Sequence, residues 1–159
     1  MGLFDMGQRS PRRGSPLLMA LLIAAVGFFM YLSQSEENPI TGVKQRVSLT
    51  PAQEIRLGLQ AAPQMAAKMG GVVPSSDPRA QEVQKIGNEI VSRSKAHRGP
   101  WKFQFHLLSD PKTINAFALP GGQIFITLGL FNKLQNEAQL AGVLAHEIGH
   151  VIQRHSAQQ

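Results

Sequence analysis

The alternation of apolar and polar residues predicts strands in the second half of the chain. Residues 101–107 alternate strictly, with Trp, Phe, Phe and Leu at the odd positions and Lys, Gln and His at the even positions. A period of two residues predicts a half-buried strand, so His106 falls on the polar face and is not expected to bind a metal. Two shorter strands, residues 115–119 and 123–127, are joined as a hairpin by the sequence Pro-Gly-Gly.

Capping residues and helical spacing predict two helices before these strands. The first begins at Thr50, which precedes proline and has glutamine at the reciprocal capping position, and it runs to about Lys68. The second follows Asp77 and ends before the Gly-Pro pair at residues 99–100, with valine and isoleucine residues on one face. We therefore expect helices and strands to pack together as an α+β domain.

The last predicted helix follows a short one near residues 128–134. Asn136 is its N-cap and Gln139 occupies the reciprocal capping position. Apolar residues at helical spacing form one broad stripe along it: Leu140, Val143, Leu144, Ile148, Val151 and Ile152. Gly142 and Gly149 each lower helix propensity by about 1 kcal/mol relative to alanine. We therefore expect these two glycines to allow other backbone, or a substrate, to approach closely.

This helix carries His146-Glu147-Ile148-Gly149-His150, an H-E-x-x-H motif. Positions i and i+4 lie on one helical face, so two imidazoles can offer neutral nitrogens to a single Zn²⁺. Glu147 is then close enough to take a proton from a water molecule at the metal. The alternative is an ordinary amphipathic helix with two exposed histidines, and the low chance frequency of the motif, together with its context, argues against it.

A catalytic zinc site normally has three protein ligands, and the sequence supplies two. On a continuous helix His155 lies about 180° from His146, so we expect it to be a solvated or helix-end residue. Glu137 fails the same test, and no Asp or Glu follows Glu147. The motif therefore predicts zinc ligands at His146 and His150, a catalytic Glu147, and no third ligand.

The stretch 115–122, Asn-Ala-Phe-Ala-Leu-Pro-Gly-Gly, together with residues 146–156, resembles metallopeptidases of the HtpX / CAAX-prenyl-protease type. Within that group the chain is most similar to the extracytoplasmic BepA-like and Oma-like branch, from about Asn38 onward. The resemblance implies a zincin-like (gluzincin) α+β peptidase domain and endopeptidase activity. It assigns zinc binding to His146 and His150 and the base role to Glu147.

The same resemblance implies a substrate-binding edge strand at Asn115, Ala116 and Phe117, although a hairpin that only packs on the helix is an equally good interpretation. The downstream glutamate that completes the zinc site in this family has no counterpart here. We therefore expect a peptidase domain that is incomplete at the C-terminus, from a fragment or a truncated gene product. The 159-residue chain alone is expected to have little proteolytic activity.

The N-terminus predicts membrane attachment. Residues 17–32 are an uncharged run, preceded by Arg9, Arg12 and Arg13. This run favours an uncleaved transmembrane signal anchor over a cleaved signal peptide, which would leave a periplasmic or secreted protein. The basic flank keeps residues 1–16 in the cytoplasm and directs the rest to the periplasmic side of the inner membrane. Residues 33–49 then form a linker, and residues 50–159 form the N-terminal part of the metallopeptidase domain.

Composition narrows the choice of partners. The chain has no cysteine, so disulfides and thiolate metal sites are excluded. The net charge is +6, but the cations are scattered without aromatic interleaving, which predicts no nucleic-acid partner. We expect a zinc-dependent endopeptidase that hydrolyses extended or misfolded envelope polypeptides. The rivals are an inactive, chaperone-like peptide-binding module and a subunit whose metal site a partner completes. The oligomeric state cannot be read from the sequence.

Overall fold

The computed structural model describes residues 35–42, 44–46 and 49–155. The predicted cytoplasmic segment 1–16 and signal anchor 17–32 lie outside the described residues. Within the described ranges, no helix is both long enough and apolar enough to cross a membrane.

A three-stranded sheet lies at the centre of the domain. Strand β3 (Gln104–Leu108) pairs in parallel with β5 (Gln123–Thr127), and β5 pairs antiparallel with β4 (Ala116–Leu119). The order β3-β5-β4 places β5 in the middle and β4 at one edge. The predicted hairpin of residues 115–127 is confirmed, and its turn contains Gly121 at φ 82° and Gly122 at φ 113°. Positive φ explains the two glycines, because residues with a Cβ rarely adopt it.

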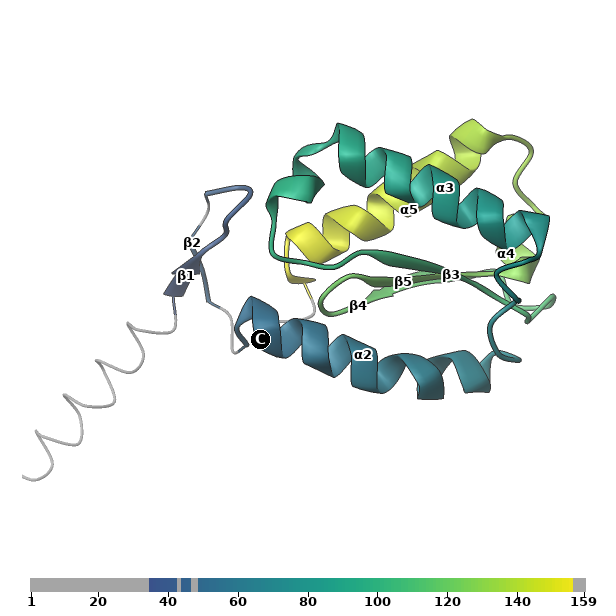
Figure 1. The fold of residues 1–159 in the computed structure, drawn as a ribbon, viewed down its shortest axis with the longest axis horizontal. Coiled ribbons are helices and arrows are strands. Elements are labelled where there is room, and N and C mark those ends of the chain that lie inside the picture. Colours follow the sequence, from purple (N-terminus) through teal and green to yellow (C-terminus); the bar gives the residue numbers. More distant parts are fainter. Residues whose placement is uncertain (1–34, 43, 47–48, 156–159) are drawn as a thin grey trace, which may run out of the picture. The chain divides into compact units, whose positions relative to one another are not determined.

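Helices cover both faces of this sheet (Figure 1). Helices α3 (Pro78–Arg93) and α5 (Glu137–Ile152) lie against one face, and α2 (Pro51–Lys68) lies against the other. Successive side chains of β5 point to opposite faces of the sheet and so contact the helices on both sides. Ile124 and Ile126 belong to the large core under α3 and α5, whereas Phe125 packs in a smaller cluster with Ala66 of α2. A strand that is covered on both faces has no solvent-exposed side, and all five residues of β5 are buried.

The helix boundaries follow the capping residues. The Thr50 side chain accepts from the Gln53 amide while the Gln53 side chain accepts from the Thr50 amide, so the predicted capping box is confirmed. Asp77 caps α3 by accepting from the Arg79 amide at 2.9 Å. A short 3₁₀ segment, η1 (Lys95–Arg98), follows α3, and a single helical turn, α4 (Leu128–Phe131), links β5 to the loop before α5.

The first predicted strand begins later than its alternation suggests. Trp101 and Phe103 precede β3, although Trp101, Phe105 and Leu107 are buried as the alternation predicts. The amides of Lys102 and Gln104 donate to the carbonyls of Gly121 and Gly122 at the hairpin turn. The stretch before β3 is therefore tied to the turn rather than paired as a regular strand.

The segment predicted to be a linker, residues 33–49, contains defined structure. It includes an antiparallel pair, β1 (Ser35–Glu37) with β2 (Lys44–Arg46). Asn38 is 1% exposed, and its Nδ2 donates to the Ile152 carbonyl in the last turn of α5 at 2.6 Å. The Asn38 Oδ1 accepts from the amides of Ile40 and Thr41. The turn sequence Asn-Pro therefore docks on the end of the motif helix, a contact between distant residues that a local pattern does not reveal.

Candidate metal centre

The motif helix is fixed at its start by the predicted cap. The Asn136 Oδ1 accepts from the Gln139 amide at 3.0 Å, and the Gln139 Oε1 accepts from the Gln135 amide at 2.8 Å. A capping box predicts that the Gln139 side chain accepts from the amide of the N-cap Asn136. In the structure it accepts instead from the amide of Gln135, one residue earlier. The buried face of the helix is formed by Leu140, Leu144, Ile148 and Val151. With this stripe turned to the core, His146 is exposed and His150 is half-buried.

The two histidines present converging nitrogens. Nε2 of His146 lies 3.0 Å from Nε2 of His150, and the two rings meet edge to face with centroids 4.5 Å apart. Two nitrogens bound at about 2.05 Å to a tetrahedral zinc ion lie roughly 3.3 Å apart. The two Nε2 atoms are therefore placed close to the separation that one zinc ion requires, and histidine nitrogen is a donor that zinc accepts.

Glu147 completes this cluster. One ligand atom from each of His146, Glu147 and His150 lies within 4.8 Å of the others. Glu147 is 8% exposed, so its carboxylate is sheltered while it stays close to the two imidazoles. Among the residues that the structure describes, no further His, Asp or Glu joins this group. The three side chains therefore form a group that could hold a metal ion, while the roles of His146 and His150 as zinc ligands and of Glu147 as the base stay predictions.

Two hollows flank Glu147 and share strand β4 as a wall. One has a volume of about 580 Å³ and is lined by Asn115 and Ala116, by His146 and Glu147, and by apolar residues of α4 and α5. The other, of about 380 Å³, is lined by residues 116–118, Glu147, His150 and His155. Ala116 and Glu147 belong to both, so the two hollows adjoin each other beside β4 and the histidine cluster.

Strand β4 has the geometry of a binding edge. Asn115 and Phe117 lie opposite Thr127 and Phe125, and the Thr127 amide donates to the Asn115 carbonyl at 3.0 Å. In an antiparallel pair, hydrogen-bonded residues alternate with residues whose N–H and C=O point away from the partner strand. Ala116 therefore presents its backbone outward at the sheet edge, between the two hollows. The Phe117 ring stacks on Phe125 at 5.0 Å, so Phe117 contributes to the packing of the sheet.

The loop before β4 is held by side chains that the sequence analysis did not single out. Asp110 accepts from the amides of Lys112 and Thr113 and from the Thr113 hydroxyl. These hydrogen bonds, led by that of Thr113, lower the pKa of Asp110 below its ordinary value. The buried Thr127 hydroxyl donates to the Thr113 carbonyl at 2.5 Å and accepts from the Asn115 amide. Together these bonds position the start of the edge strand beside the histidines.

The structure changes the interpretation of His155. This residue is exposed and lies past the helix end, as expected, but α5 ends at Ile152 and the chain then turns. The assumption of a continuous helix is therefore wrong, and His155 does not lie on the opposite side. Its Nδ1 is 2.6 Å from Nδ1 of His150, with ring centroids 4.9 Å apart. His106 stays apart from the cluster, stacked on Phe125 and 2.9 Å from the Gln123 side chain.

A buried ion pair at the end of α5 also escaped the sequence analysis. Arg154 is 2% exposed, and its Nη2 lies 2.6 Å from Oε1 of Glu54, which is also 2% exposed. The other carboxylate oxygen of Glu54 accepts from Nε1 of Trp101 at 3.0 Å. No local signal identifies such a pair, because Glu54 also fits the positive start of α2 and Arg154 the negative end of α5.

The two glycines of α5 do not pack closely on any described residue. A Cβ built at Gly142 or Gly149 meets no atom within 4 Å. Gly142 instead lines the larger hollow beside His146. Close approach of other backbone is thus not observed at either position within the described residues, and room for a substrate at Gly142 stays a prediction.

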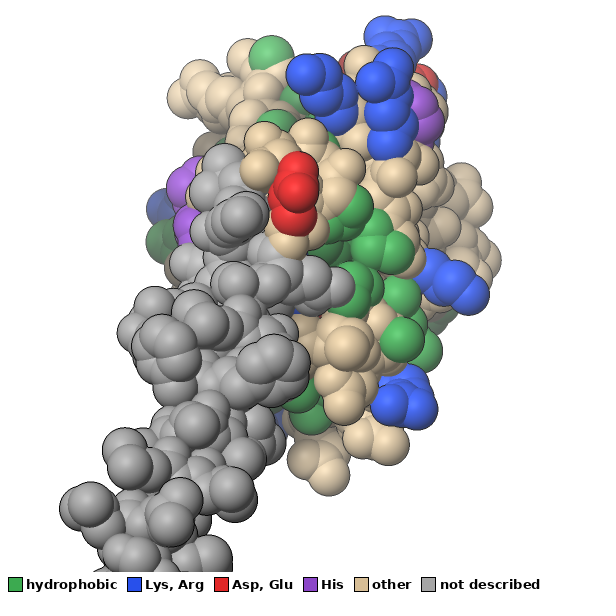
Figure 2. All heavy atoms as spheres, turned by 90° about the vertical axis from the view of Figure 1, so that its left-hand side faces the viewer, with side chains coloured by type: hydrophobic (Ala, Val, Ile, Leu, Met, Phe, Trp, Pro, Cys, Tyr) green, Lys and Arg blue, Asp and Glu red, His purple; other side chains and the backbone are tan. Residues whose placement is uncertain are grey.

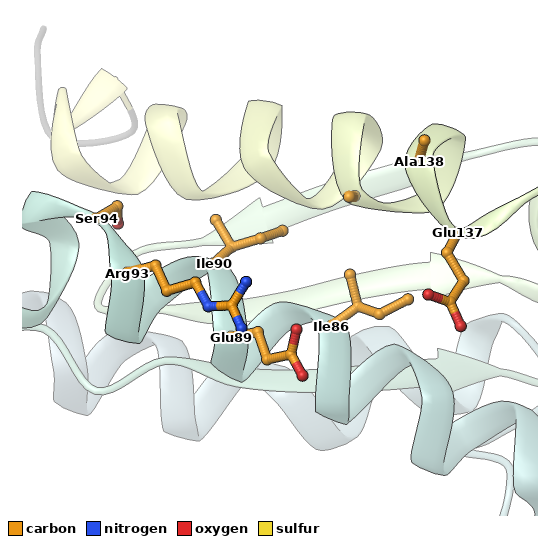
Figure 3. A pocket seen from close by; sticks show the side chains of 8 residues that line it. Ile86, Glu89, Ile90, Arg93, Ser94, Glu137 and Ala138 are labelled. Atoms are coloured by element: carbon orange, nitrogen blue, oxygen red, sulfur yellow. The ribbon is translucent and has the colours of Figure 1, made fainter.

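A separate groove runs between α3 and α5 (Figure 3). Ile86 and Ile90 of α3 face Ala138 and Ala141 of α5, and the rim carries Glu89, Arg93 and Glu137. It contains no histidine, and none of its residues belongs to the histidine cluster. Figure 2 shows a face on which Lys and Arg side chains gather at the upper edge and otherwise stand apart, with an acidic side chain (red) near the centre.

Comparison with known proteins identifies relatives of this chain. A beta-barrel assembly-enhancing protease of Escherichia coli is 34% identical over 145 residues, covering 88% of this chain and 28% of that protein. A mitochondrial metalloendopeptidase OMA1 of Schizosaccharomyces pombe is 32% identical over 142 residues, covering 89% of this chain and 41% of that protein. A putative beta-barrel assembly-enhancing protease of Vibrio cholerae is 41% identical over 83 residues, covering 52% of this chain and 16% of that protein.

The chain therefore spans well under half the length of these curated relatives. The family described as peptidase family M48 matches residues 77–159, which include the edge strand, the loop before it and the whole H-E-x-x-H helix. The mixed α and β architecture with its small sheet agrees with that match, and the family implies a metal at the histidine cluster. On these grounds the chain belongs to peptidase family M48.

Proposed function

We propose that this chain is the part of a zinc-dependent metalloendopeptidase that carries two zinc ligands and the catalytic base. The observation that carries the proposal is the convergence of His146 and His150, with Nε2 atoms 3.0 Å apart, beside the sheltered carboxylate of Glu147. His146 and His150 bind zinc through these nitrogens. A zinc ion held there supplies Lewis-acid chemistry, which polarises a carbonyl oxygen and makes water a better nucleophile.

Glu147 acts as the general base and then as the general acid. It takes a proton from the attacking water and delivers it to the leaving amine. Its burial at 8% exposure keeps the carboxylate away from bulk water, where a hydrogen bond to the nucleophile would be weaker. The two hollows beside Glu147 leave room for the substrate chain on either side of the bond to be cut.

The substrate is an extended or unfolded polypeptide. Ala116 presents an outward N–H and C=O at the sheet edge, so a peptide can add as a further strand beside β4. Main-chain hydrogen bonds of this kind recognise the substrate backbone whatever its side chains are. They therefore favour unfolded or misfolded proteins in general over one specific sequence. Asn115, Ala116 and Phe117 form the binding strand in this proposal, Ala116 through its backbone and Phe117 through its packing.

The proposed location is the inner membrane, with the peptidase part facing the periplasm. Residues 17–32 form the anchor, residues 1–16 stay in the cytoplasm, and residues 50–159 belong to the peptidase domain. One relative is named for enhancing β-barrel assembly and another is named as mitochondrial. Envelope proteins that fail to fold are therefore the proposed substrates.

The metal site needs a third protein ligand for catalysis. No described residue outside the trio supplies one, so we propose that it comes from outside the described residues or from a partner chain. A peptide-binding module without activity is the other candidate, favoured by the exposure of His146 and by the two-histidine set.

The test compares zinc content and the cleavage of unfolded casein for the whole gene product that contains this chain. Glu147→Gln should retain zinc and cleave at least ~100-fold more slowly, because general-base catalysis contributes about 10²–10⁴-fold. His146→Ala should lose both zinc and activity. Casein cleavage that persists in Glu147→Gln, or wild-type protein that holds no zinc, would refute the proposal. Zinc without cleavage in the wild type would favour the binding module.

A further inference from the structure

The turn at the end of the motif helix has an unusual backbone. Helix α5 ends at Ile152 with Gln153 as its C-cap, and Arg154 follows at φ 56°. Among the described residues, Arg154 is the single non-glycine residue with positive φ. The left-handed conformation crowds the Cβ of an L-residue, so glycine usually occupies this position after a helix. Other contacts must therefore hold Arg154 in this conformation.

Buried hydrogen bonds of the Arg154 side chain stabilise this left-handed conformation. Its Nε donates to Oε1 of Glu54 at 2.7 Å, and its Nη2 donates to the Leu49 carbonyl at 2.5 Å. Glu54 is itself held by the indole N–H of Trp101. The guanidinium is planar and presents its donors as a fixed fork, so these bonds fix the orientation of the side chain as well as its position.

The turn carries His155 back to the motif. On a continuous helix the residue nine positions after His146 would lie on the far side, whereas here the Nδ1 atoms of His155 and His150 are 2.6 Å apart. Nε2 of His150 faces His146, so its two ring nitrogens have different partners. When Nε2 binds a metal, Nδ1 must carry the proton, and that N–H then points at the Nδ1 of His155.

We propose that His155 is a positioning residue for His150. It accepts the Nδ1–H of His150, which sets the tautomer and the ring orientation that direct Nε2 toward the metal. The Arg154–Glu54 pair in turn holds His155 in place. The inference rests on the proposed zinc site and adds a residue to it. Metal-binding histidines almost always donate their other N–H to an acceptor that tunes their affinity, and here the acceptor is a second imidazole.

The test measures the zinc affinity of the whole protein by competition with a chelator, at one fixed pH. His155→Ala should weaken zinc binding by about 10–100-fold, the usual effect of losing such an acceptor. His155→Asn is the matched control, because its amide oxygen occupies nearly the same place as Nδ1 and can accept the same bond. It should restore most of the affinity. Both variants should unfold as the wild type does without metal, since His155 is exposed.

Cadmium-113 NMR with nitrogen-15 histidine separates positioning from direct binding. Coupling of the metal to Nε2 of His146 and His150, and to no nitrogen of His155, supports the proposal. Coupling to His155 would overturn it by making that residue a ligand, as would wild-type zinc affinity in His155→Ala. If the proposed zinc site itself is wrong, His146→Ala will bind zinc as tightly as the wild type. That result distinguishes failure of the zinc site from failure of the role proposed for His155.

Discussion

Arg154 and Glu54 form a buried ion pair that joins the end of the motif helix to the first turn of α2, with Nη2 and Oε1 2.6 Å apart. Both side chains are almost fully excluded from solvent, at 2% exposure each. A charge taken out of water is costly unless its partner and its hydrogen bonds are all present. Here the Leu49 carbonyl and the Trp101 indole provide the additional bonds. The pair therefore ties two separate segments, the start of α2 and the stretch at Trp101, to the end of the helix that holds the histidines.

Replacement of Glu54 by glutamine should destabilise the protein strongly. The substitution leaves the Arg154 guanidinium buried without its counter-charge, a change that typically costs about 3–5 kcal/mol. The measurement is the free energy of unfolding in urea. Glu89→Gln on the exposed face of α3 is the matched control and should change that free energy by less than about 0.5 kcal/mol. Equal, small effects of both substitutions would show that the pair does not hold the fold.

Alanine at Gly142 and at Gly58 should have opposite effects on stability. A Cβ at Gly142 meets nothing within 4 Å, so Gly142→Ala should gain about 0.5–1 kcal/mol of helix propensity. A Cβ at Gly58 in α2 would lie 2.0 Å from the Pro120 carbonyl oxygen, so Gly58→Ala must push α2 away from the hairpin turn and should destabilise the fold. Urea unfolding of the two variants checks both signs, and a destabilised Gly142→Ala would reveal a contact at that position.

Proline at Ala116 should weaken substrate binding without unfolding the sheet. The outward N–H of Ala116 takes no part in the pairing of β4 with β5, and proline is tolerated at such edge positions. One lost hydrogen bond of about 1–1.5 kcal/mol corresponds to a rise in KM of roughly tenfold for an unfolded peptide substrate. Ala116→Ser retains the N–H and should keep the wild-type KM. An unchanged KM in the proline variant would exclude pairing at this edge.

The cap of α3 should give a pH-dependent contribution to stability. The side-chain and backbone hydrogen bonds from Arg79, together with its charge, lower the pKa of Asp77 from 3.8 to about 2. A lowered pKa means that the folded state favours the carboxylate, so its contribution is fully present above about pH 4 and is lost as the pH falls through 2. Asp77→Asn keeps a capping oxygen and removes the charge together with the second oxygen, which accepts from Nη2 of Arg79.

This variant should therefore melt below the wild type at pH 6, and the gap should close toward pH 2. Thermal unfolding followed by circular dichroism at pH 6, 4 and 2 gives the comparison. A gap that is the same at all three values would mean that the charge of Asp77 contributes nothing beyond its capping oxygen. Because Arg79 is exposed and Asp77 is partly exposed, the effect is expected to be small and to shrink in high salt.

Much of the candidate site could be predicted because its parts are neighbours along the chain. The spacing of His146 and His150 puts both on one helical face whatever the rest of the fold does. The same holds for the Asn136 cap and for the hairpin of residues 115–127, whose turn needs two glycines at positive φ. The edge position of β4 was a weaker prediction, since it depends on β3 pairing with β5 across the hairpin.

The amino-acid sequence by itself thus predicted that His146 and His150 share one helical face with Glu147 beside them, and it predicted the elements that carry them, since these follow from backbone periodicity and local hydrogen bonds. Only the tertiary structure decided that Asn38 caps α5, that Glu54 neutralises Arg154, and that His155 returns to His150. Glu54 and Arg154 are 100 residues apart in sequence. Contacts of this kind depend on how α2 and α5 are brought together around the sheet, and no local pattern of residues records that arrangement.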